Sequence, residues 1–225
     1  MQRFFDILFS IILLFLLLPF FVFIIFILKI TGEGSIFFIQ ERIGFRQKAF
    51  KLLKFSTMLK NSPNMKNGTI TLKNDPRILP IGNILRKTKI NELPQLINIL
   101  KGDMSFVGPR PQTFRCFNAF SKKDQTNIIK IRPGLTGIGS LIFRNEENML
   151  TGQSNPNFFY DTTIMEYKGS LESWYSENQN IKYYFLIIIL TFWSVIFPNT
   201  KIVWIFFPSI PKPSKKLKKI LLDND

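Results

Sequence analysis

The chain has 225 residues, a formal net charge of +15, no histidine and one cysteine, Cys116. Without histidine, the sequence excludes histidine-based acid–base catalysis, serine-type triads that use histidine, and imidazole zinc sites; carboxylates, lysine, arginine or hydroxyl groups must carry any chemistry. A single cysteine excludes an intramolecular disulfide bond and a cysteine zinc cluster.

The first element is an apolar run from Ile7 to Leu28, which only Ser10 interrupts with a polar side chain and which holds Pro19 near its middle. At 1.5 Å per residue, about 22 residues reach roughly across a hydrocarbon core, and the run is too long for the apolar part of a cleaved signal peptide. The sequence therefore predicts a membrane-inserted helix within residues 1–31. Basic residues after the run place that side in the cytoplasm. Whether Pro19 turns the helix back or kinks a full span stays open at this point.

Two short strands, Ser35 to Gln40 and Ala49 to Phe55, are predicted to form a hairpin around a charged loop. Arg42 in this loop and Lys54 near its end are candidate phosphate contacts, or else solvated or lipid-facing charges. Residues 60–74 are rich in Asn, Ser, Lys, Gly and Pro, which predicts a surface loop.

Order resumes at Asp75-Pro76-Arg77, and a short helix from Ile84 to Lys87 carries Arg86. Asp75 and Arg77 are charged groups that could face the same pocket as Arg86. The alternative for Asp75 is a cap on the turn at Pro76.

A helix is predicted next, starting at Asn91, because Leu93, Leu96, Ile97 and Leu100 recur with helical spacing. Asn91 is a suitable N-cap, and Pro94 falls in the first turn, where a missing N–H costs nothing. Lys101 and Gly102 end the helix. Glu92 either complements the helix dipole or acts as an oxygen ligand for a phosphate-bridging Mg²⁺.

Beyond this helix, Met104 to Val107 is predicted to be a brief buried strand that Gly108 ends. Pro109 and Pro111 fix the backbone on both sides of Arg110, which would hold its guanidinium group in one direction for a bidentate grip on phosphate oxygens. Helical turns are predicted over residues 114–120 and 126–131. A tight turn is expected from Arg132 to Gly137.

The C-terminal third is less patterned. Arg144, Glu146 and Glu147 contact a sugar or are surface charges. The apolar run from Tyr183 to Phe197 is about fifteen residues, shorter than a span needs, and its aromatic flanks favour an interfacial helix over an internal core helix. The lysines from Lys212 onward are predicted to lie on anionic lipid.

Three motifs in the central region, Leu-Pro-Gln-Leu (93–96), Lys-Gly-Asp-Met-Ser (101–105) and Val-Gly-Pro-Arg-Pro (107–111), resemble the signature of the bacterial sugar transferases. The resemblance covers roughly residues 2–137, and includes Arg42, Lys54, Arg86 and the Arg132 turn. These small monotopic phosphoglycosyl transferases load a sugar phosphate from a nucleotide sugar onto polyprenyl phosphate. The resemblance implies a re-entrant first helix, a location on the cytoplasmic face of the bacterial inner membrane, and Mg²⁺ as cofactor.

In that family the helix opens with an Asp-Glu pair, in which the Asp is the phosphosugar nucleophile and the Glu is the magnesium ligand. Here Asn91 stands in place of the Asp, and an amide is a poor nucleophile. The resemblance thus implies Asn91, Glu92 and Arg86 as catalytic positions and Glu92 as metal ligand. Substrate contacts are expected from the charged residues already described: Arg42, Lys54, Asp75, Arg77, Arg110 and Arg132.

The expected fold is α+β and mainly helical, with a membrane-inserted helix (1–31), a cytoplasmic transferase domain (32–180), an interfacial apolar segment (181–210) and a basic tail (211–225). The leading hypothesis is a transferase that starts a surface glycan, with nucleotide sugar, polyprenyl phosphate and anionic lipid as partners. The second is a catalytically silent relative that binds lipid phosphate or a protein. A nucleic-acid binder fits the charge but leaves Ile7 to Leu28 unexplained. Oligomeric state is left open, a homo-oligomer included.

Overall fold

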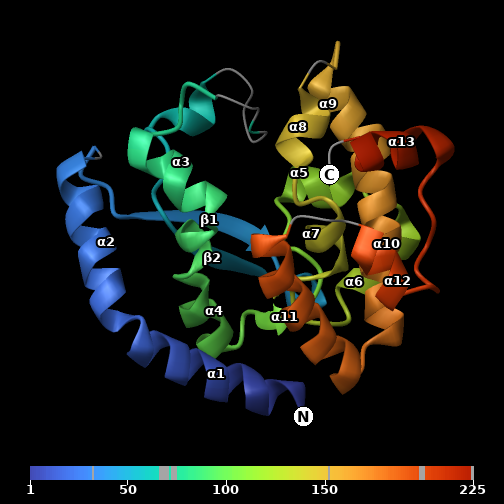
Figure 1. Ribbon diagram of the computed structural model, residues 1–225, viewed down its shortest axis with the longest axis horizontal. Helices are drawn as coiled ribbons and strands as arrows, with labels where there is room; N and C mark the ends of the chain where they lie inside the picture. The colour runs from blue at the N-terminus through green and yellow to red at the C-terminus, as the bar shows by residue number, and fades with distance from the viewer. Residues whose placement is uncertain (32, 66–70, 72–74, 152, 198–200, 224–225) are drawn as a thin grey trace.

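The computed structural model describes residues 1–31, 33–65, 71, 75–151, 153–197 and 201–223. The fold is α+β and mainly helical, as predicted (Figure 1). It contains two small two-stranded sheets. Most of the predicted loop at 60–74 lies outside the described residues.

The apolar N-terminal segment forms two helices, α1 (Gln2–Leu16) and α2 (Leu18–Thr31), that meet at an angle of 62°. Pro19 lies in the first turn of α2, where it cannot donate to the carbonyl of Phe15, so the bend falls where the sequence predicted a kink or turn. No single described helix is long and apolar enough to cross a membrane. The two helices of the bent pair are long and apolar enough together, judged by length and composition only. One side of the pair exposes large apolar side chains, among them Phe15, Leu18, Phe23 and Phe26.

The predicted hairpin is present as strands β1 (Phe37–Ile43) and β2 (Ala49–Phe55), which pair antiparallel from Phe37 opposite Phe55 to Ile43 opposite Ala49. β1 is displaced from the predicted strand and runs three residues beyond Gln40. Arg42 therefore lies in a strand rather than in the loop, because the pairing with β2 continues up to the short 3₁₀ turn η1 (Phe45–Gln47).

The second sheet joins β3 (Ser105–Val107) and β4 (Gly134–Thr136) in parallel. β3 confirms the predicted strand. The prediction of a tight turn from Arg132 to Gly137 is wrong for its central residues, which form strand β4. A Cβ atom on Gly134 would lie 2.1 Å from the backbone nitrogen of Gly108, so glycine is needed there for the two chains to approach.

The predicted helix at Asn91 begins later and differently. A 3₁₀ turn, η3 (Ile90–Glu92), comes first, and α4 (Gln95–Lys101) follows with Pro94 at its N-cap position. Asn91 is therefore not the N-cap: the amides of Glu92 and Leu93 already donate to the carbonyls of Lys89 and Ile90, at 3.0 and 3.1 Å. The predicted helix end is confirmed, since Gly102 is left-handed with φ of 95°.

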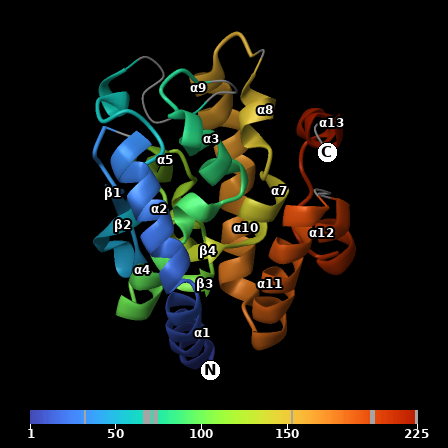
Figure 2. The ribbon, with the colours of Figure 1, turned by 60° about the vertical axis from the view of Figure 1, so that its left-hand side comes forward.

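The remaining helices pack around these elements and are mostly short up to residue 164. They are α3 (Pro80–Lys87), α5 (Phe114–Asn118), α6 (Lys122–Ile128), α7 (Ile138–Ile142), α8 (Glu146–Leu150), α9 (Pro156–Phe159) and the π-helical turn η4 (Tyr160–Ile164), followed by the longer α10 (Met165–Asn178) and α11 (Ile181–Ile196) and by α12 (Lys201–Phe206) and α13 (Lys215–Asp223); a further 3₁₀ turn, η2, is Ser62–Asn64. In Figure 2 the hairpin and α4 lie on one side of the molecule, α11 to α13 lie on the other, and α10 runs between them.

The larger core cluster runs between these two sides, from Leu52 and Leu96 to Ile142, Leu171 and Tyr184. A smaller cluster fixes α2 against Phe55 and Leu85. α11 turns Tyr184, Ile187 and Leu190 inward and leaves Ile189, Phe192 and Trp193 exposed. The basic C-terminal segment includes α13, whose Leu217 and Leu221 are buried.

Candidate functional site

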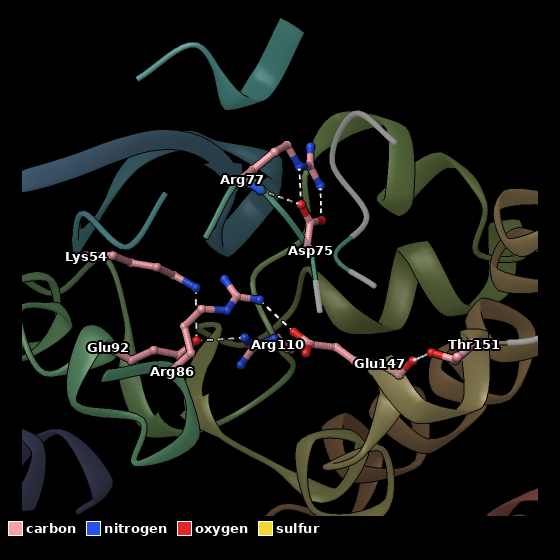
Figure 3. A network of polar contacts seen from close by, with 8 residues as sticks. All are labelled: Lys54, Asp75, Arg77, Arg86, Glu92, Arg110, Glu147 and Thr151. Atoms are coloured by element: carbon pink, nitrogen blue, oxygen red, sulfur yellow. Dashed lines mark hydrogen bonds and ion pairs between the residues drawn. The ribbon is translucent and has the colours of Figure 1, made fainter. Parts of the chain in front are cut away.

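Two cations and one carboxylate from three separate parts of the chain form the centre of the site (Figure 3). Oε1 of Glu92, in η3, accepts a hydrogen bond from Nζ of Lys54 in β2 at 2.9 Å and from Nη2 of Arg110 at 2.8 Å. Arg110 follows β3, so the parallel pairing of β3 and β4 holds its loop in place. The structure thus brings together three residues that the sequence predicted as site residues.

The charges of this cluster are strongly coupled. Burial by itself would raise the pKa of Glu92, but Arg110, Lys54 and Lys89 outweigh it and hold the pKa well below its ordinary value. Burial lowers the pKa of Lys54 to about 8 against the opposing effect of Glu92, and Glu92 raises the pKa of Arg110. Glu92 is ionised and carries one negative charge, whereas Lys54 and Arg110 together carry two positive charges. The cluster therefore has a net positive charge that suits a phosphate ligand.

Arg42 lies beside this cluster and supports its loop. Its Nη1 donates to the carbonyl oxygen of Pro111 at 3.1 Å, directly after Arg110. Burial, and next the charge of Arg110, lower the pKa of Arg42 to about 10. Its buried Nε has no hydrogen-bond partner within the part of the chain that the structure describes, which leaves one donor for a ligand.

Arg86 is a further basic side chain that faces the same region, and it contacts Glu147 at the start of α8 with an N–O distance of 2.6 Å. Figure 3 shows this pair beside Arg110 and Glu92. The side chain of Arg86 is 26% exposed, so an incoming anion can reach it.

Asp75 and Arg77 form an ion pair of 2.6 Å in which both side chains are buried. Arg77 also donates to the carbonyl of Ser62 at 3.1 Å, which ties the segment before α3 to residue 62. Figure 3 shows the pair apart from the Glu92 cluster, so its visible role is to fix the chain.

Arg132 is placed at the opposite end of α4 from Glu92. Its Nε donates to the carbonyl oxygen of Gly102 at 2.8 Å, and its guanidinium lies over the ring of Phe45 at 5.5 Å. These contacts hold the end of α4 against the turn of the hairpin.

Asn91, the neighbour of Glu92, is 6% exposed and does not cap a helix. Its Oδ1 is buried and has no hydrogen-bond partner among the described residues. An unpaired buried carbonyl oxygen is costly, so this atom is a ready acceptor for a donor or cation that enters the site.

The side-chain oxygens of Asn91 and Glu92 suit a Mg²⁺ ion that is shared with substrate phosphates. Among the described residues no three His, Cys, Asp or Glu side chains cluster as a metal cage. Mg²⁺ in phosphate-transfer sites commonly uses one or two carboxylates together with substrate phosphates. The carboxylate of Glu92 and the unpaired Oδ1 of Asn91 are hard oxygen ligands that fit such a shared site, and not a preformed one.

Sequence reasoning missed Glu172 on α10. Its Oε1 accepts from the backbone N–H of Arg110 at 3.3 Å, and burial raises its pKa to about 7. A Cβ atom on Gly139 would lie 2.4 Å from that oxygen, so glycine makes room for the carboxylate. No local signal marks Glu172, because its partner lies 62 residues away in the sequence.

Comparison with known proteins gives a consistent result. The sequence model of a family described as bacterial sugar transferase matches residues 1–198. The exopolysaccharide production protein ExoY of Sinorhizobium fredii is 35% identical over 164 residues, which cover 67% of this chain and 72% of that protein. The undecaprenyl-phosphate galactose phosphotransferase of Salmonella typhimurium is 33% identical over 193 residues, or 79% of this chain and 37% of that protein. The UDP-glucose:undecaprenyl-phosphate glucose-1-phosphate transferase of Escherichia coli is 37% identical over 134 residues, or 59% and 29%.

Proposed function

We propose, from the fact that this chain belongs to the bacterial sugar transferase family, that it is a phosphoglycosyl transferase that moves a sugar 1-phosphate from a nucleotide diphospho-sugar to polyprenyl phosphate. The products are a polyprenyl diphospho-sugar, which starts a surface glycan, and a nucleoside monophosphate. One observation carries the proposal: Lys54 and Arg110 converge on Glu92 and keep a net positive charge where a diphosphate would bind.

In the reaction, an oxygen of the lipid phosphate forms a bond to the phosphorus that bears the sugar. The bond from that phosphorus to the oxygen bridging the two phosphates breaks, and the nucleoside monophosphate leaves. Arg110 and Lys54 would bind the phosphate oxygens and stabilise the charge that moves to the leaving group. Glu92 keeps both cations oriented. Arg86 would release its hydrogen bond to Glu147 and bind the substrate instead.

Mg²⁺ is part of this proposal. Glu92 would hold it, with Oδ1 of Asn91 and the substrate phosphates as further oxygen ligands. When bound, Mg²⁺ neutralises phosphate charge during transfer. The low pKa of Glu92 supports this role, because the carboxylate is ionised at neutral pH.

We also propose that the bent pair α1–α2 is a re-entrant membrane element with both ends on the cytoplasmic face. The 62° bend and the exposed apolar side chains of both helices support it. The outer face of α11, with Phe192 and Trp193, suits the depth of lipid headgroups. The active site would then lie close to the headgroup of its lipid substrate.

A second candidate function follows from Asn91. If transfer in this chain requires a carboxylate at that position, the protein is a silent relative that binds lipid phosphate. Purified protein with polyprenyl phosphate, Mg²⁺ and a panel of nucleotide sugars tests both candidates. Release of nucleoside monophosphate that depends on the lipid is expected, and no release from any donor would contradict the transferase function.

A further inference from the structure

A second polar cluster lies next to the phosphate-binding side chains, and the transfer chemistry does not use it. Lys168, on α10, is 4% exposed and pairs with a carboxylate oxygen of Glu146, the first residue of α8. Its ammonium group lies 5.1 Å from the ring centre of Phe143 and 5.5 Å from that of Tyr160. A buried lysine held by two aromatic rings and one carboxylate is a built feature, because desolvating an ammonium group is costly.

The cluster is joined to the phosphate site on two sides. Lys168 and Glu172 are one helical turn apart on α10, and Glu172 accepts the backbone N–H of Arg110. On α8, the neighbour of Glu146 is Glu147, which binds Arg86. The charge of Glu146 also acts on Arg110. Glu146 thus lies beside the groups that hold the diphosphate, on the side of α8 and α10.

The backbone around this cluster is irregular. Tyr160 opens the π-helical turn η4, which interrupts the run from α9 into α10. π-helical turns are rare and frequently occur at functional sites, because the extra residue re-aims a side chain. Here the turn places Tyr160 over the ammonium group of Lys168, while Glu146 itself keeps 23% of its side chain exposed.

We propose that Glu146, held in place by its ion pair with Lys168, is the residue that selects the sugar of the donor. This inference rests on the proposed function. An ionised carboxylate accepts hydrogen bonds from hydroxyl or ammonium groups and repels another carboxylate. The donor is therefore a nucleotide-linked neutral hexose or amino sugar and not a uronic acid.

The test uses the full-length protein and compares UDP-glucose, UDP-N-acetylglucosamine and UDP-glucuronate as donors. Because Glu146→Gln alone leaves Lys168 buried and unpaired, the main variant is Glu146→Gln with Lys168→Met, which removes both charges. Loss of one charged hydrogen bond predicts that kcat/KM for the preferred donor falls by about tenfold or more. Discrimination against UDP-glucuronate should shrink by a similar factor, while the affinity for UDP, which lacks the transferred sugar, stays unchanged.

Glu166→Gln is the matched control, since Glu166 is exposed on the same helix as Lys168. It should leave kcat/KM for every donor unchanged. If the double variant changes kcat/KM for all three donors equally, or weakens UDP binding to the same extent, the assignment of Glu146 is overturned while the transferase function stands. If the wild-type protein prefers UDP-glucuronate to the other two donors, the assignment of Glu146 is overturned. If it releases nucleoside monophosphate from no donor of the wider panel of nucleotide sugars, the transferase function fails as well.

Discussion

At the scale of single residues, Glu92 decides how the site is charged. It shares one oxygen between Lys54 and Arg110, and the distances of 2.9 and 2.8 Å are those of charge-assisted hydrogen bonds. Removing its charge would leave two partly buried cations uncompensated and would take away the carboxylate proposed for Mg²⁺.

We therefore expect Glu92→Gln to abolish turnover, measured as release of nucleoside monophosphate. Arg110→Ala should raise the KM for the nucleotide sugar by roughly 10- to 100-fold, the loss of a hydrogen bond to a charged group. The exposed Glu166 provides the control Glu166→Gln. Wild-type rates in both variants would show that Glu92 and Arg110 are not part of the active site.

Asn91 leaves three routes open: direct attack by the lipid phosphate, a substitute nucleophile, and inactivity. Asp103, the next carboxylate along the chain, lies beyond the far end of α4 and contacts Asn98 at 3.2 Å, which removes it from the vicinity of Glu92. Direct attack needs only positioning and charge neutralisation, and the Glu92 cluster is intact.

We expect wild-type turnover without a phosphosugar bound covalently to the protein, as checked by intact-protein mass spectrometry during the reaction. A trapped adduct on the wild type would rule out the direct route. No turnover by the wild type, together with turnover restored by Asn91→Asp, would establish the silent relative.

The protonation of Lys54 is expected to make kcat/KM depend on pH. Burial lowers its pKa to about 8, and lysine binds phosphate only when protonated, so the binding-competent form is lost as the pH rises through that value. We expect kcat/KM to fall above pH 8 for this reason. Lys54→Arg should move the fall to higher pH, because arginine keeps its charge. A fall at the same pH in this variant would assign it to another group.

At the scale of elements, the proposed re-entrant path depends on the bend between α1 and α2. Pro19 removes one helical hydrogen bond, and the two halves turn by 62°. Arg3 at the start of α1 donates to the carbonyl of Leu100 at 2.8 Å, so the beginning of this pair is fixed to the end of α4. A helix whose N-terminus contacts the catalytic part of the chain suits a re-entrant path.

We expect a cysteine tag placed before Met1 to be protected from a membrane-impermeant thiol reagent in intact cells, and to react after permeabilisation. The native Cys116 is buried, so it gives little background. Labelling of the tag in intact cells would show that α1–α2 crosses the membrane.

At the scale of the whole molecule, two kinds of surface would act together at the proposed membrane location. The net charge of +15 would attract the chain to anionic lipid, and the exposed apolar side chains of α1, α2 and α11 would provide a second, uncharged attachment. Exposed lysines of α13, Lys215, Lys218 and Lys219, add to the charge, while the apolar side of that helix is buried.

We expect the protein to stay in the membrane fraction after a wash with ~1 M salt, because salt screens charges but not apolar insertion. Replacing Lys215, Lys218 and Lys219 by Gln should therefore change the retained fraction very little. Release of the wild-type protein by salt alone would contradict insertion.

The features that neighbouring residues control could be predicted from the sequence. The bend near Pro19, the hairpin, the strand before Gly108 and the end of α4 at Gly102 all follow from periodicity or from residues with restricted backbones. Glu92, Lys54 and Arg110 could be chosen as site residues from motifs and from a family resemblance. Asn91 is not the N-cap that the sequence predicts, because the left-handed Lys89 starts a 3₁₀ turn one residue earlier.

Which of these residues meet depends on the tertiary fold. Contacts such as Lys54 with Glu92, Arg86 with Glu147 and Arg110 with Glu172 join positions 38, 61 and 62 residues apart. No periodicity encodes them, since they depend on how whole helices and strands pack. The same holds for the parallel pairing of β3 with β4 and for the burial of Lys168, whose stability comes from partners on other elements.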